Sequence, residues 1–182
     1  MDPQPGDFAV VNVPPPSGAV ISFAEWLAGG GRDAEWNHAV IATRRDYDGS
    51  LLIVEALPGG SREVAWHYED QPHKWSTGII GGCPRAATQA RALVAIPYSW
   101  ADYAAIGLHR LGVSTAGLQG YIASSHHLIC SQLVDLAWLR AGCHLFDDGR
   151  WPGFVMPSDL GQILTSLLRP PEIFVTGTLI AA

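Results

Sequence analysis

The chain has 182 residues, 48% of them hydrophobic and 15% charged, with seven tryptophans. This composition excludes an intrinsically disordered protein, and the length suits one domain with a substantial core, so a single domain over residues 1–182 is predicted. The net charge of −6 is spread without runs, which gives no basic surface for a nucleic acid. No apolar run approaches the length that crosses a bilayer, so an integral membrane segment is not expected.

The first half of the chain is predicted to form mainly strands. A strand is expected from Phe8 to Val13, because three prolines then end it. Ser17 begins a short predicted helix that the triple glycine at 29–31 stops. Residues 62–69 and 77–82 are weaker strand candidates.

Two apolar runs predict an antiparallel hairpin. They cover His38–Thr43 and Leu51–Ala56, and Asp48-Gly49 between them supplies turn chemistry. Helices are expected from Arg85 to about Ile96 and from Ser99 to Gly112.

The cleanest predicted helix covers Cys130–Ala141, where apolar residues fall on one stripe and Gly142 ends the pattern. A last helix begins near Ser158, and the apolar tail after Pro171 is a candidate edge strand. Strands come first and helices later, which favours an α+β fold over a doubly wound parallel sheet.

Cys130 is the candidate nucleophile because it begins a helix. Free backbone N–H groups and the positive end of the helix dipole stabilise a thiolate at that position. Cysteine statistics alone favour the alternative, a small buried apolar residue on the inner stripe. Cys83 and Cys143 lack this placement and are interpreted as structural.

A cysteine nucleophile needs a base, and His38 is the only histidine at the edge of a strongly apolar strand. Glu55 ends the next apolar run, where a carboxylate is costly unless it has a partner. Direct pairing of His38 with Glu55 leaves a loop of about six residues. A two-residue turn would instead place Glu55 opposite Ala42, about 13 Å along the strand from His38.

Metal and disulfide chemistry have weaker support. Three cysteines do not make a disulfide framework, although the sequence leaves open whether two of them form one disulfide. At least one thiol is expected to be free. His126, His127, Cys143 and His144 lie near Cys130 in sequence, but their spacing does not match a structural zinc site. No metal and no other cofactor is therefore expected.

Five short motifs occur in a fixed order along the chain, namely PGDFAVV, WNHAVIATR, LLIVEALPGG, IPYSW and HLICSQLVDLAWLRAG. Together they resemble the permuted NlpC/P60 papain-like group, in particular its YiiX/YebB-like amidase and peptidase branch. The match runs from Gly6 to about Leu160 and has the permuted order, with the histidine strand first and the cysteine helix last.

The resemblance implies a permuted papain-like fold, in which an antiparallel sheet packs against helices. It implies that Cys130 is the nucleophile, that His38 is the base and that Glu55 orients the imidazole. It matches Tyr98 to a tyrosine near the site. Backbone N–H groups at the helix start would hold the oxyanion. Tyr98, Ser131 and Trp36 are the candidates for substrate binding or oxyanion stabilisation.

The implied function is a cysteine hydrolase that cleaves an amide or peptide bond through an acyl-thioester on Cys130. Candidate substrates are peptides, peptidoglycan fragments and acyl amides, and the oligomeric state is open. The alternatives are a non-catalytic binding or structural domain with an aromatic groove, and a lipid amide or ester hydrolase or acyltransferase. The N-terminus shows no secretory signal, so the cytoplasm is the default expectation, with release or injection onto a cell wall as the other route.

Overall fold

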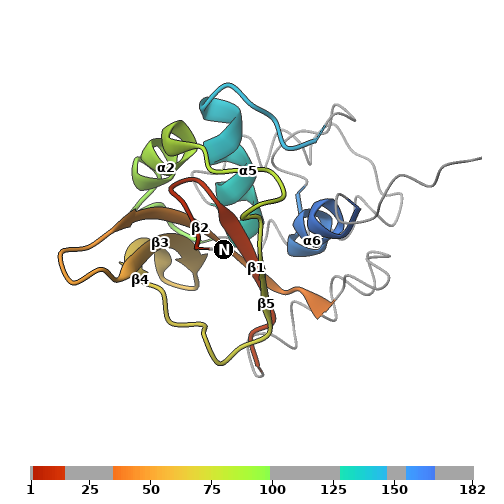
Figure 1. Cartoon of the computed structure of the whole chain (residues 1–182), viewed down its shortest axis with the longest axis horizontal. Coiled ribbons are helices and arrows are strands. Elements are labelled where there is room, and N and C mark those ends of the chain that lie inside the picture. Colours follow the sequence, from red (N-terminus) through yellow and green to blue (C-terminus); the bar gives the residue numbers. More distant parts are fainter. Residues whose placement is uncertain (1, 15–34, 99–127, 147–154, 167–182) are drawn as a thin grey trace, which may run out of the picture.

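The structure is a computed structural model, and it describes residues 2–14, 35–98, 128–146 and 155–166. Within these ranges the fold is α+β, as predicted, with a five-stranded antiparallel sheet of order β4-β3-β2-β1-β5 and three helices (Figure 1). The strands are β1 (Phe8–Val11), β2 (His38–Arg45), β3 (Leu51–Leu57), β4 (Gly60–Ala65) and β5 (His73–Trp75). The helices are α2 (Pro84–Arg91), α5 (Cys130–Arg140) and α6 (Pro157–Ser166).

The helices cover one face of the sheet. Helices α2 and α5 pack on each other and on β2, and α6 lies against β1, β2 and β5 (Figure 1). Because side chains alternate along a strand, every second residue faces the helices and is buried. These residues are Phe8, Val10, Ala39, Ile41, Val54 and Ala56.

The opposite face has its own apolar layer. Ala9, Val11, Val40 and Ile53 form it together with Tyr68. Trp66 and Trp75, whose ring centroids are 4.8 Å apart, pack against this layer. The central strands are therefore buried on both sides, which explains why β2 and β3 are nearly continuous apolar runs in the sequence.

Helix α2 is shorter than the predicted 85–96 helix. It ends at Arg91, and Ala95 then has a φ of 68°, outside the helical region. Ser61 of the edge strand β4 accounts for this end. Its carbonyl accepts the N–H of Ala95 at 2.9 Å, and its hydroxyl donates to the carbonyl of Leu93 at 2.5 Å. Both backbone groups bond to the sheet, so the helix cannot continue.

The weak strand candidate at residues 77–82 is wrong. The segment forms a turn in which the N–H groups of Ile79 and Ile80 both donate to the carbonyl of Ser76. Gly78 and Gly81 have φ values of 75° and 85°, which a strand does not accommodate. The fifth strand is instead β5, which the sequence pattern missed, while the 62–69 candidate overlaps β4.

The other described elements follow the prediction closely. Helix α5 has the expected start at Cys130, and α6 begins one residue before Ser158. Asp159 caps α6 by accepting the backbone N–H of Met156 at 2.7 Å. The predicted helices from Ser17 and Ser99, and the apolar tail, lie outside the described residues.

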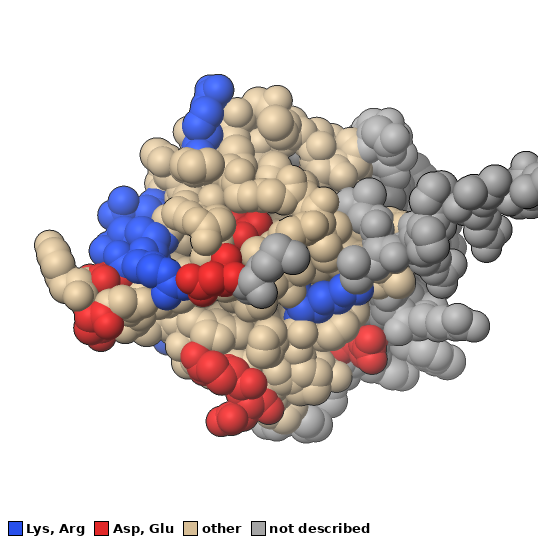
Figure 2. All heavy atoms as spheres, in the orientation of Figure 1, with Lys and Arg blue, Asp and Glu red and all other residues tan. Residues whose placement is uncertain are grey.

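The surface mixes charges of both signs. Figure 2 shows Lys and Arg side chains beside Asp and Glu side chains on the face drawn there. Glu63, for example, pairs with Arg44 at 3.3 Å and with Arg91 at 3.1 Å. None of the helices within the described ranges combines the length and hydropathy that a membrane crossing requires.

The contact between Gly6 and Cys83 predicts a sharp stability effect. Gly6 has a φ of 92°, and a Cβ built there would collide with the backbone of Cys83. Gly49 has a similar φ of 87° but open space around it, so it is the matched control. We expect Gly49→Ala to cost about 1 kcal/mol of unfolding free energy from backbone strain, and Gly6→Ala at least about 2 kcal/mol more. Equal losses in urea unfolding would contradict the collision.

Candidate active site

His38 is held at the start of β2. It is 3% exposed and lies opposite Val11 of β1. The buried Asn37 before it accepts the N–H of Val13 at 2.7 Å and donates to the carbonyl of Val13 at 3.0 Å. These two bonds tie the segment after β1 to the entrance of β2, which fixes the backbone that carries the imidazole.

The predicted contact between His38 and Glu55 is present, but neither predicted register is correct. Nε2 of His38 lies 3.1 Å from Oε2 of Glu55. Glu55 is paired with Val40 rather than with His38 or Ala42. The imidazole therefore meets the carboxylate along a diagonal, between neighbours on the same face of an antiparallel pair.

A β-bulge at Thr43 creates this arrangement. Arg44 pairs with Leu52, whereas Ala42 pairs with Ile53, so Thr43 is an extra residue in β2. Without the bulge, the register that pairs Arg44 with Leu52 would continue along β2. It would place Glu55 opposite Ile41, on the face that the helices cover. The one-residue shift moves Glu55 to the face of Val40, where it can meet His38.

Glu55 is a fully buried carboxylate with donors on both oxygens. Oε2 accepts the Tyr68 hydroxyl at 2.5 Å, beside His38. Oε1 accepts Nε and Nη2 of Arg62 at 2.9 and 2.8 Å. His67 lies 3.9 Å from the same oxygen. A carboxylate taken out of water needs such compensation, since a buried unpaired charge costs several kcal/mol.

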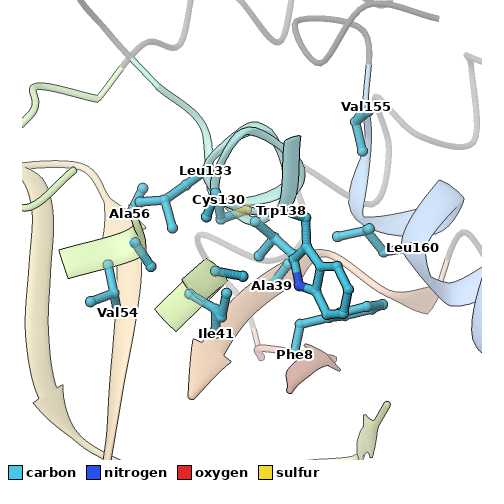
Figure 3. Packing of buried hydrophobic residues seen from close by; sticks show 14 of the residues in the cluster. Phe8, Ala39, Ile41, Val54, Ala56, Cys130, Leu133, Trp138, Val155 and Leu160 are labelled. Atoms are coloured by element: carbon cyan, nitrogen blue, oxygen red, sulfur yellow. The ribbon is translucent and has the colours of Figure 1, made fainter. Parts of the chain in front are cut away.

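Cys130 begins α5 in the layer between that helix and the sheet, near Ala39 and Ala56 (Figure 3). Its side chain is fully buried, and its sulfur is in no disulfide. Cys83 and Cys143 are also free thiols, so the expectation of at least one free thiol is confirmed. The side chain of Gln132 caps the helix by accepting the N–H of Ile129 at 2.9 Å.

The His38 ring interacts with groups on both faces of the sheet. Because it is the first residue of its strand, its ring meets Glu55 on one sheet face and is hydrogen-bonded to Cys130, which packs on the other. Burial lowers the pKa of His38, but the charge and hydrogen bond of Cys130, followed by those of Glu55, outweigh it and raise the pKa to about 9. These interactions favour the charged form of the imidazole over the neutral form.

The same interactions act on Glu55 and Tyr68. Burial alone raises the pKa of Glu55. The hydrogen bond and the charge of His38 lower it, as do the hydrogen bonds from Tyr68 and Arg62, and the resulting pKa is about 2. Burial and the Glu55 carboxylate raise the pKa of Tyr68, so its phenol stays protonated and can act as a donor.

The other three predicted site residues have different surroundings. Tyr98 forms an isolated parallel bridge with Leu128, which places it beside the entrance to α5. The Ser131 hydroxyl donates to the carbonyl of Val155 at 2.7 Å. The ring of Trp36 packs against Gly161 of α6. Their roles in binding or oxyanion stabilisation stay predictions.

Sequence reasoning missed Tyr68 and Arg62. One signal could have found Arg62, because Pro58-Gly59 joins β3 to β4 as a two-residue hairpin loop. That loop pairs Leu57 with Gly60, and counting back pairs Glu55 with Arg62. Tyr68 follows the end of β4 and carries no comparable pattern.

The described residues offer no metal site. No group of three or more His, Cys, Asp or Glu side chains in these ranges could hold a metal ion. Of the histidines considered above as zinc ligands, His144 pairs with Asp135 at 3.0 Å. His126 and His127 lie outside the described residues.

No protein-family model matches the chain, and no curated protein matches it either. The chemistry of the candidate site therefore rests on its own geometry.

The shifted pKa of Glu55 predicts how stability depends on pH. Its pKa is about 2 when folded and 4.5 when unperturbed, so the stabilisation is fully present above pH 4.5 and is lost as pH falls through 2. As the pH falls over this range, the free energy of unfolding should decrease by up to about 3 kcal/mol more in the wild type than in Glu55→Gln. Glu69→Gln, at an exposed glutamate, should keep the wild-type slope. Parallel urea-unfolding curves for wild type and Glu55→Gln would contradict the assignment.

Proposed function

We propose that the chain is a thiol-dependent amidase or peptidase with a permuted papain-like fold. The observation that carries the proposal is the position of His38, which is hydrogen-bonded to Cys130 on one side and to Glu55 on the other. A nucleophile, a base and a group that orients the base form the constellation that acyl transfer requires.

The order of the elements supports the fold part of the proposal. The histidine strand β2 comes first, β3 supplies Glu55, and the cysteine helix α5 comes last and packs on β2 and β3. This is the order that the permuted group implies.

In the proposed acylation step, Cys130 acts as a thiolate and His38 as an imidazolium. Sγ attacks the carbonyl carbon and forms a tetrahedral oxyanion. The Nε2–H group of His38 stays hydrogen-bonded to Glu55. Nδ1 is therefore the nitrogen that interacts with Cys130 and with the leaving group. When the C–N bond breaks, the proton on Nδ1 passes to the leaving nitrogen, and an acyl-thioester remains.

Water completes the reaction. Neutral His38 takes a proton from water as its oxygen attacks the thioester, the C–S bond breaks, and the thiolate–imidazolium pair returns with a carboxylic acid as product. The oxyanion is held by backbone N–H groups at the start of α5. The contribution of Ser131 is its backbone N–H, because its hydroxyl already donates to Val155.

A second candidate function, ligand binding without catalysis, has one specific observation in its favour. A cavity of about 600 Å³ opens beside the sheet face opposite the helices, and Trp66, His73 and Trp75 line it together with Glu69. Charged and polar side chains, among them Asp2, Arg45 and Ser50, complete the lining, so aromatic and polar contacts are both on offer to a ligand. The alkylation experiment separates the two candidates.

Alkylation of Cys130 by iodoacetamide across pH tests the proposal. Because the thiol is buried, the readout is the pH profile of its rate, with the exposed Cys143 as the reference thiol in the same molecule. We expect wild-type Cys130 to react at lower pH than Cys143. In His38→Ala, its rate at neutral pH should fall on the order of tenfold or more as the profile moves to higher pH.

Two results would contradict the enzyme proposal. One is a profile for Cys130 that matches Cys143, and the other is a profile that His38→Ala leaves unchanged. Either would favour the binding candidate. If the profile behaves as expected, a panel of peptidoglycan fragments, peptides and acyl amides, with Cys130→Ser as the inactive control, identifies the substrate class.

A further inference from the structure

We infer that Tyr68 is a positioning residue that fixes the Glu55 carboxylate against His38, an inference that rests on the proposed function. The phenol hydroxyl donates to Oε2 at 2.5 Å, and this is the same oxygen that His38 contacts at 3.1 Å. The Tyr68 ring also lies 5.5 Å from the His38 ring, centroid to centroid. Tyr68 therefore donates a hydrogen bond to Glu55 and lies beside the ring of His38.

Tyr68 and Arg62 hold different oxygens of the carboxylate. Arg62 binds Oε1 from a side chain that is 53% exposed, whereas Tyr68 is 7% exposed. Arg62 helps to compensate the buried charge, but its exposed guanidinium also bonds to water, whereas the hydroxyl of the buried Tyr68 is held on Oε2 by a short bond to a charged acceptor. Tyr68 should therefore determine where Oε2 sits, with Arg62 in a secondary role.

The position of Oε2 decides which nitrogen of His38 carries a proton when the ring is neutral. An ionised carboxylate only accepts hydrogen bonds, so contact with Oε2 keeps the proton on Nε2. Nδ1 then keeps its lone pair for Cys130. If the carboxylate could rotate away, the other tautomer would become populated and the ring would lose its function as a base.

A purely structural role is the alternative for Tyr68. Its ring packs in the apolar layer with Val40 and Ile53 and lies 5.5 Å from the ring of Trp66. Tyr68→Phe separates the two roles, because it keeps the ring and removes only the hydroxyl. Ile53→Val is the matched control, since it trims the same apolar layer around the Tyr68 ring and leaves the hydroxyl of Tyr68 in place.

The first measurement is the alkylation rate of Cys130 at neutral pH. We expect Tyr68→Phe to lower it about tenfold and Ile53→Val to leave it within about twofold of wild type. In a Glu55→Ala background, Tyr68→Phe should have no additional effect, because there is no carboxylate left to position. The loss in Arg62→Ala should be smaller and should shrink in about 1 M salt.

The second measurement does not depend on a reactive thiol. In a Cys130→Ser background, ¹⁵N NMR of labelled histidines reports the tautomer of neutral His38. We expect the Nε2–H form alone when Tyr68 is present, and a mixture of both forms in Tyr68→Phe.

The alkylation and NMR measurements together distinguish failure of the proposed function from failure of the inference about Tyr68. If His38→Ala leaves the reactivity of Cys130 unchanged, the proposed function fails, and the NMR arm still tests the placement of Glu55. If Tyr68→Phe keeps the single Nε2–H tautomer, or alkylates as fast as wild type while His38→Ala is slow, Tyr68 has only a packing role and the inference is overturned.

Discussion

The buried carboxylate of Glu55 is the constraint on which the rest of the candidate site depends. A charge without solvent is tolerated only when donors surround it, and here three side chains from three parts of the chain supply them. His38 comes from β2, Arg62 from β4 and Tyr68 from the segment after β4. The bulge at Thr43 is what turns Glu55 toward these donors instead of toward the helices.

The same geometry connects the two faces of the sheet. The helices bury an apolar layer on one face, and Cys130 begins a helix within that layer. Glu55 lies on the opposite face with Tyr68. His38 stands at the end of β2, where a side chain can interact across the end of the sheet with both. A residue further along the strand would be confined to one face, so a position at the end of β2 is needed for contact with groups on both faces.

Much of this arrangement was predictable from local patterns. The apolar stripe and the glycine stop predicted α5 with its start at Cys130, and two apolar runs around a turn predicted the hairpin. A carboxylate at the end of an apolar run also predicted that Glu55 has a partner, because such a position is costly otherwise. Each of these signals is local in the sequence.

The features that were missed depend on contacts far apart in sequence. The Thr43 hydroxyl lies 2.7 Å from Oε1 of Glu63, which is 20 residues further along the chain, and no local pattern marks the bulge. The early end of α2 similarly depends on Ser61, which bonds to the backbone groups that follow the helix. Tyr68 looks like an ordinary aromatic residue until the fold brings it to Glu55.

Titration of His38 by ¹⁵N NMR tests the central claim most directly, namely that Cys130 and Glu55 hold a charged imidazole between them. We predict that the wild-type ring stays protonated up to a pKa of about 9. This pKa should fall in Cys130→Ser, because the charge and hydrogen bond of Cys130 raise it more than those of Glu55 do. A wild-type pKa near the ordinary 6.5, unchanged in Cys130→Ser, would contradict the claim.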